Sequence, residues 1–265
     1  MKRASLSVLA IAALMPWAAC AQTSAADGIA QYRALLADGN PAELWEAKGE
    51  LLWKQPRGLK NVSFETCDLG KGAGVVKGAF VELPRYFADT KRVQDLESRL
   101  LTCMAAQGFN AAEIAATPFG RGEQVNLEAL VAYVSAESKG MKFKLSQAHP
   151  EERQMFEAGK RIFYFRGGPY DFSCASCHGE AGKRIRLQDL PDLSTNPGDG
   201  VGFAAWPAYR VSSGELWGMQ RRLNDCYRQQ RFPFPGYASD ATIALGTFLG
   251  VQVAGAVSIA PAIKR

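Results

Sequence analysis

The segment that decides the fold is Cys174-Ala175-Ser176-Cys177-His178, which reads CASCH in a chain of 265 residues. This spacing lets two thiols add to the vinyl groups of a haem while the adjacent imidazole reaches the iron. A thioredoxin-like pair would need a flanking β-α-β pattern, and a zinc site would need more ligands than His149, the only other histidine. The motif therefore predicts one covalently bound haem c, attached through Cys174 and Cys177, with His178 as an axial ligand.

The sequence on both sides of the motif predicts a mainly α-helical domain. Upstream, residues 156–164 (FEAGKRIFY) have apolar residues at helical spacing, and downstream residues 244–249 (ALGTFL) form a second apolar segment. These two segments resemble the terminal helices that cross in class I cytochromes c. The expected domain therefore has two crossing helices, with loops around the haem between them.

An internal repeat extends this prediction to the first half of the chain. Residues 83–103 (LPRYFADTKRVQDLESRLLTC) align without a gap with residues 206–226 (WPAYRVSSGELWGMQRRLNDC). The apolar segments before and after this block also recur, with residues 45–53 echoing 156–164 and residues 129–133 echoing 244–248. We expect two tandem class I cytochrome c-like domains, residues 28–145 and 150–265. The boundary falls at His149-Pro150, because proline disfavours helix in the residue before it.

The first half lacks a complete attachment motif. In the alignment, residues 67–72 (CDLGKG) stand opposite residues 174–179 (CASCHG), so that Gly70 replaces the second attaching cysteine and Lys71 replaces the histidine. The first domain is therefore predicted to bind no haem.

Two residues compete for the remaining axial position of the haem. Met219 and Cys226 are seven residues apart and hence on one face of the same expected helix. Methionine is the commoner ligand of small electron-transfer cytochromes, and a lone cysteine often serves only as a small buried residue. The repeat favours Cys226, because it pairs Cys103 with Cys226 but Leu96 with Met219.

Arginines surround Cys226 in the segment RRLNDCYRQQR, residues 221–231. Arg222 lies one helical turn before the cysteine, where its positive charge favours a thiolate and its planar donors suit an oxyanion. For Arg221, Arg228 and Arg231, the competing interpretation is a solvated basic surface.

The N-terminus predicts export. Lys2 and Arg3 precede an apolar run and small residues, as in a secretory signal cleaved near Ala21, whereas the run is shorter than the roughly 20 residues of a membrane span. A lipid anchor at Cys20 fits less well because Trp17 stands where a branched aliphatic residue is wanted. Removing residues 1–21 leaves 29 basic and 26 acidic residues, a charge too small to indicate nucleic acid. We expect a periplasmic protein without a membrane span.

Taken together, these features resemble the SoxA family, the larger cytochrome subunits of the SoxAX complexes of bacterial sulfur oxidation. The likeness rests on CASCHG at 174–179, RRLNDC at 221–226 and FPFPG at 232–236. It implies a haem-dependent L-cysteine S-thiosulfotransferase of the single-haem branch, which joins thiosulfate oxidatively to a cysteine of the carrier SoxYZ. It also implies that Cys226 is both catalytic, as a persulfide, and an axial ligand, and that Arg222 binds the substrate. The partner SoxX would provide a second haem, since the reaction releases two electrons.

Two other functions stay open at this point. One is a plain electron-transfer cytochrome c with Met219 as the ligand, and the other is a thiosulfate dehydrogenase that forms tetrathionate.

The last expectation concerns Cys67 and Cys103, which align with Cys174 and Cys226. They would face the same vacated pocket in an exported protein, so we expect them to form a disulfide.

Overall fold

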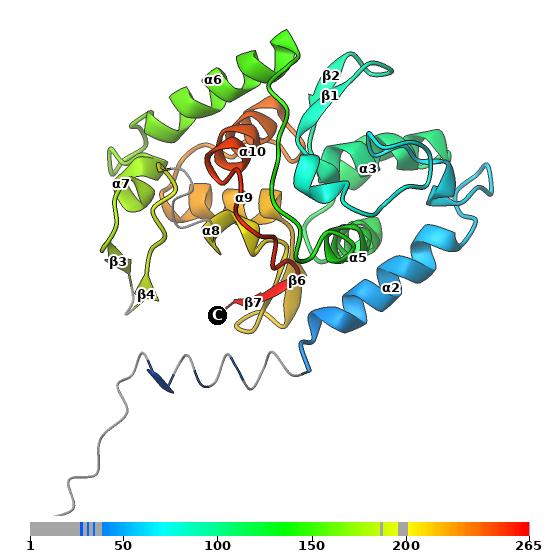
Figure 1. Cartoon of the computed structure of the whole chain (residues 1–265), viewed down its shortest axis with the longest axis horizontal. Coiled ribbons are helices and arrows are strands. Elements are labelled where there is room, and N and C mark those ends of the chain that lie inside the picture. Colours follow the sequence, from blue (N-terminus) through cyan, green and yellow to red (C-terminus); the bar gives the residue numbers. More distant parts are fainter. Residues whose placement is uncertain are drawn as a thin grey trace, which may run out of the picture.

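The computed structural model describes residues 39–185, 188–195 and 201–264, together with residues 27–28, 31 and 34. The expected signal peptide, residues 1–21, lies outside these described residues. Helices dominate the fold, and they are joined by short strands and glycine-containing loops (Figure 1). Within the described part of the chain, no helix is long and apolar enough to cross a membrane.

The first half of the chain builds one crossed pair of helices and a hairpin. Its elements are α2 (Ala42–Lys54), η1 (Phe64–Thr66), η2 (Phe80–Glu82), β1 (Arg85–Phe87), β2 (Arg92–Gln94), α3 (Leu96–Ala106), α4 (Ala111–Ala116) and α5 (Gly122–Ala136). Helix α2 packs against α5, and β1 pairs antiparallel with β2.

Within the described residues, the second half repeats the outer helices, the hairpin and the helix after the hairpin in the same order, but it has three further strands and lacks one short helix. Its elements are α6 (Pro150–Tyr164), α7 (Cys174–His178), β3 (Arg184–Ile185), β4 (Gln188–Asp189), α8 (Val201–Ala204), β5 (Ala208–Arg210), β6 (Glu215–Trp217), α9 (Met219–Gln229), α10 (Asp240–Gln252) and β7 (Ala262–Lys264). Helix α6 packs against α10, and β5 lies between antiparallel β6 and parallel β7.

One glycine in each half sets how closely the paired helices approach. A Cβ on Gly49 of α2 would overlap the carbonyl oxygen of Ala129 on α5, and a Cβ on Gly159 of α6 would overlap that of Ala244 on α10. Only glycine permits such an approach of backbones, so the same crossing is built twice.

The predicted repeat matches the positions of the elements. The starts of β5, β6 and α9 each lie 123 residues after those of β1, β2 and α3, as the ungapped alignment requires. Helices α3 and α9 each follow a hairpin, and each lies next to the helix pair of its own half (Figure 1).

The two halves share one apolar core. The segment that joins α5 to α6 contains Phe143, which is 1% exposed and makes edge contacts with Phe80 of the first half and Phe203 of the second. Lys142 on this segment also forms a β-bridge with Val257, after α10. The site described below is therefore supported by packing from both halves.

Candidate functional site

Helix α7 holds the CASCH motif in little more than one helical turn. At its start, the Ser176 N–H donates to the Ser173 hydroxyl at 3.1 Å, and the Ser173 N–H donates to the Ser176 hydroxyl at 2.9 Å. This reciprocal cap satisfies backbone donors that the helix start leaves free. Cys174 and Cys177 are half-buried free thiols. The local structure thus keeps both attachment sulfurs available.

His178 is oriented by the loop that follows β4. Its Nδ1 lies 2.9 Å from the carbonyl oxygen of Pro191, which can only accept, so Nδ1 carries the proton and Nε2 carries the lone pair. Burial lowers the pKa of His178, and the hydrogen bond to Pro191 opposes that shift only in part. The ring is therefore held as the neutral tautomer that a metal-ligating histidine needs.

A cavity of about 380 Å³ lies next to α7. Apolar side chains from α6, α8, α9 and α10 form much of its wall, among them Phe163, Phe203, Leu223, Leu245 and Leu249. The cavity also brings together all the haem-binding residues that the sequence predicts, namely Cys174, Cys177, His178 and Cys226. An apolar cavity with two thiols and an oriented imidazole on one wall and a further thiol on another fits haem c.

Helix α9 supplies the wall with the sixth-ligand candidates. Met219 and Cys226 both line the cavity, as expected for residues on one helix face. Position in the cavity therefore does not choose between them. Burial raises the pKa of the Cys226 thiol, while the charge of Arg222 lowers it to a smaller extent. The charge of Arg222 thus acts in the expected direction, toward the thiolate, and burial opposes it.

The arginines of α9 and of the turn that follows it lie in different environments. Arg222 lines the cavity, and its Nη1 donates to Asp225 at 3.1 Å. Arg228 is exposed and pairs with the same carboxylate at 2.7 Å. Arg231 lies over the ring of Tyr170, with its guanidinium carbon 5.5 Å from the ring centre.

Arg221 is not part of a solvated basic surface. Its side chain is only 11% exposed, pairs with Glu128 of α5 at 2.8 Å and with Glu215 of β6, and stacks on Trp217. Arg221 therefore links the two halves. Sequence reasoning missed this role because Glu128 is 93 residues away along the chain.

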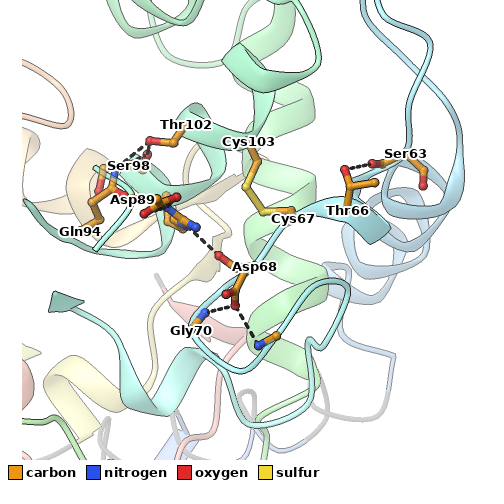
Figure 2. The surroundings of a disulfide bond; sticks show 12 residues. Ser63, Thr66, Cys67, Asp68, Gly70, Asp89, Gln94, Ser98, Thr102 and Cys103 are labelled. Carbon is orange, nitrogen blue, oxygen red and sulfur yellow. Dashed lines mark hydrogen bonds and ion pairs between the residues drawn. A yellow bond between two sulfur atoms is a disulfide. The ribbon is translucent and has the colours of Figure 1, made fainter. Parts of the chain in front are cut away.

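In the first half, Cys67 and Cys103 form the predicted disulfide, with their Cα atoms 5.6 Å apart (Figure 2). Both are buried in the core of that half. This pair joins the loop after η1 to the middle of α3.

The structure corrects which residues of the two halves correspond. The β-bridge Gly167–Phe172 before α7 recurs as Arg57–Val62 before η1, 110 residues earlier. The sequence alignment placed Cys67 opposite Cys174, which is an offset three residues smaller than that of the β-bridges. The two offsets differ because the loops after the two motifs differ in length. In the observed register, Phe64, Cys67 and Asp68 stand in the places of Cys174, Cys177 and His178.

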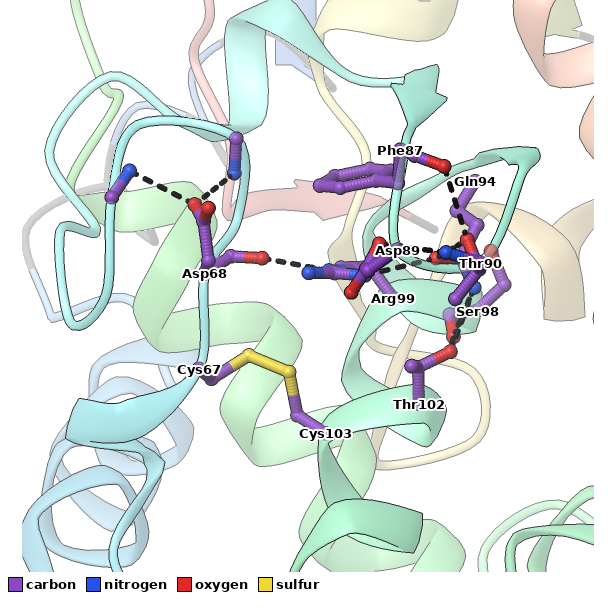
Figure 3. Close-up of polar contacts among 12 residues, drawn as sticks. Cys67, Asp68, Phe87, Asp89, Thr90, Gln94, Ser98, Arg99, Thr102 and Cys103 are labelled. Atoms are coloured by element: carbon purple, nitrogen blue, oxygen red, sulfur yellow. Dashed lines mark hydrogen bonds and ion pairs between the residues drawn. A yellow bond between two sulfur atoms is a disulfide. The ribbon is translucent and has the colours of Figure 1, made fainter.

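In the first half, the counterparts of two cavity-lining residues are buried side chains. Phe64 is fully buried and stacks on Trp53, with ring centres 5.5 Å apart. Arg99, the counterpart of Arg222, is 4% exposed and lies over Phe87 at 4.0 Å. Its Nε donates to the Asp68 carbonyl at 2.7 Å, and its Nη1 donates to Asp89 (Figure 3).

Comparisons with known proteins match this chain to a cytochrome c domain family, to proteins named SoxA and to a solved SoxXA structure. A family model described as SoxA/TsdA, cytochrome c domain, matches residues 48–143. The chain is 49% identical to the L-cysteine S-thiosulfotransferase subunit SoxA of Hydrogenophilus thermoluteolus, over 100% of both chains. It is 33% identical to a subunit of the same name from Hydrogenobacter thermophilus, covering 85% of this chain and 82% of the relative. The crystal structure of SoxXA from P. pantotrophus superposes with a TM-score of 0.71, at 22% identity, over 89% of this chain and 84% of that one.

Fold and site together define a mainly α-helical c-type cytochrome, with the haem c that a CASCH cavity of this kind accommodates. Within that class, the chain belongs to the SoxA family, since the identity of 49% extends over its full length.

Proposed function

We propose that the protein is the SoxA subunit of an L-cysteine S-thiosulfotransferase that acts on thiosulfate and on a cysteine of the SoxYZ carrier. The observation that carries this proposal is the single cavity shared by the CASCH motif, Cys226 and Arg222. The names of the relatives support the same activity. A carrier thiol and thiosulfate give a carrier S-thiosulfonate, one proton and two electrons, which pass to cytochrome c.

One haem c would be held in this cavity through thioether bonds to Cys174 and Cys177. His178 and Cys226 would be the residues that bind its iron, and the support for Cys226 is the repeat that pairs it with Cys103. When bound, the haem supplies a one-electron acceptor next to the Cys226 sulfur.

The protein's own residues would prepare the substrates. The Cys226 sulfur lies on the wall of the cavity, where it would act as the nucleophile and carry sulfur as a persulfide. Arg222, which lines the same cavity, would bind the thiosulfate dianion through charge-assisted hydrogen bonds. The apolar part of the wall would limit the access of water and so strengthen these electrostatic contacts.

A second cytochrome subunit follows from the electron count. Two electrons leave in the reaction and one haem accepts one, so a partner haem is needed. The fold match is to a SoxXA structure, which supports SoxX as the partner in a heterodimer.

For the first half, we propose a cytochrome c-like domain without haem, residues 28–145, followed by a haem-binding domain, residues 150–265. The match of a cytochrome c family model to residues 48–143 supports the first assignment. The buried Phe64 and the Cys67–Cys103 disulfide support the absence of haem there. A disulfide also suits the periplasm, the compartment to which residues 1–21 would direct the chain.

The test of this function is Cys226→Met in the complete complex with the second cytochrome and the carrier. We expect covalent haem to remain and thiosulfate-dependent loading of the carrier, followed by mass spectrometry, to disappear. Carrier loading at the wild-type rate would refute the proposal. An absorption band of methionine-ligated ferric haem in the wild type would favour Met219 and simple electron transfer.

The intact mass of the mature protein is a second measurement. It gives the number of haems and shows whether extra sulfur is bound to Cys226. Assaying tetrathionate without any carrier separates the transferase from a thiosulfate dehydrogenase.

A further inference from the structure

Arg210, at the end of β5, lines the same cavity as Arg222 and Cys226. Its side chain is half-buried, and its Nε is buried without a hydrogen-bond partner. Among the described residues, no acidic side chain pairs with this guanidinium, whose one aromatic contact is Trp217 at 5.1 Å. A buried guanidinium nitrogen without a hydrogen-bond partner costs free energy, and an anion bound in the cavity would satisfy it.

The charges facing Arg210 support this reading. Burial first, and then the positive charge of Arg222, lower the pKa of Arg210, while Asp225 and Cys226 oppose that shift. Asp225 already accepts hydrogen bonds from Arg222, Arg228 and Gln229, so its charge is shared. Lys264, which lies in register with Arg210 on β7, and the acidic Asp189 also line the cavity.

The first half provides an internal comparison in which the same arrangement is neutralised. There Arg99, the counterpart of Arg222, donates to Asp89 and stacks on Phe87. In the second half, 123 residues later, Ser212 stands in the place of Asp89 and Arg210 in the place of Phe87. Both of these differences add positive charge, because one removes an acidic residue and the other adds a cation. A third difference, Asp225 in the place of Thr102, adds one carboxylate, which Arg222, Arg228 and Gln229 share.

We infer that Arg210 is a second substrate-binding residue, which together with Arg222 receives the sulfonate group of a thiosulfate dianion beside Cys226. This inference rests on the function proposed above. Two guanidinium groups match a doubly charged oxyanion better than one does, so the pair selects dianions over monoanions. Arg210 makes no bond to the reacting sulfur and acts by binding and orientation.

The kinetic test uses Arg210→Gln and Arg210→Lys in the complete complex, with thiosulfate varied at saturating carrier. For Arg210→Gln we expect KM for thiosulfate to rise about 10- to 100-fold, the range for loss of a charge-assisted hydrogen bond, with kcat changed less than about threefold. Arg210→Lys keeps the charge and should recover part of the loss. Arg166→Gln is the matched control, since it removes an exposed arginine paired with Asp171 outside the cavity.

A binding test does not depend on turnover. Sulfate, an unreactive dianion, should raise the melting temperature of the haem-loaded wild type more than nitrate does at equal ionic strength. Arg210→Gln should abolish that difference and Arg166→Gln should keep it. If Arg210→Gln does not assemble with haem, Arg210→Lys in the same two assays decides.

Two results would overturn the inference. One is a KM change for Arg210→Gln no larger than that of Arg166→Gln. The other is an unchanged KM accompanied by a shifted haem reduction potential, which would assign Arg210 to a haem propionate. Failure of the wild type to load the carrier would instead refute the proposed function, and the sulfate measurement would still report on Arg210.

Discussion

Removing the Cys67–Cys103 disulfide should destabilise the first half without removing the haem. The crosslink closes a loop with a sequence separation of 36 residues. For such a loop the chain-entropy relation gives about 4 kcal/mol of stabilisation at 25 °C. The double variant Cys67→Ala/Cys103→Ala should lose about that much free energy of unfolding. Neither cysteine lines the cavity next to α7, so haem attachment should be retained.

The assay is guanidinium unfolding of the haem-loaded protein, followed by circular dichroism, with and without a reductant. Wild type in reductant is the control, because it loses the crosslink but keeps both sulfur atoms in the core. It should approach the stability of the double variant, with the remaining difference reporting the lost packing of sulfur. Equal stability of oxidised wild type and the double variant, to within about 1 kcal/mol, would refute the reasoning. Loss of haem in the double variant would show that the first half does more than support the second.

Two further predictions concern buried contacts. Gly159→Ala should push α6 away from α10, because the new Cβ would overlap the Ala244 carbonyl oxygen. We expect the free energy of unfolding, measured by thermal unfolding, to fall by about 1–3 kcal/mol or more. Gly246→Ala on α10 is the control: its Cβ would have no atom within 4 Å, so a cost equal to that of Gly159→Ala would contradict the argument. Burial raises the pKa of Glu128 to about 7, despite the charge of Arg221. Below about pH 4.5, Glu128 is protonated in both the folded and the unfolded protein, so it does not affect the free energy of unfolding. Above about pH 7 it is ionised in both states, and the raised pKa lowers the free energy of unfolding by on the order of 3 kcal/mol, so stability should fall as the pH rises between these values. Glu128→Gln should flatten that fall in melts at pH 5 and pH 8, and an unchanged slope would exclude Glu128 as its cause.

Several features of the protein could be predicted from local sequence. The CASCH motif is contiguous because its two thiols and imidazole must reach one haem from a single turn, so five letters identify it. The block of residues 83–103 repeats in 206–226 without insertions, since a hairpin followed by a helix tolerates few changes in length. The spacing of Met219 and Cys226 likewise placed both on one helix face.

The correspondence within CDLGKG needed the tertiary structure. Sequence letters matched the first cysteine of each half, whereas the β-bridges before η1 and α7 match Cys67 with Cys177. A loop can change length without changing the turn that precedes it. The match of residue types alone therefore aligned the two halves with an offset that was three residues too small.

The roles of two arginines also depended on packing. Arg221 and Arg222 are neighbours in sequence, but successive residues on a helix point about 100° apart. One pairs with Glu128 from the other half, and the other lines the cavity. Arg210 gave no signal in the sequence, since folding alone brings Arg210 and Cys226 to the wall of one cavity. Covalent attachment is encoded by neighbouring residues, whereas charge in a cavity is set by distant segments that folding brings together.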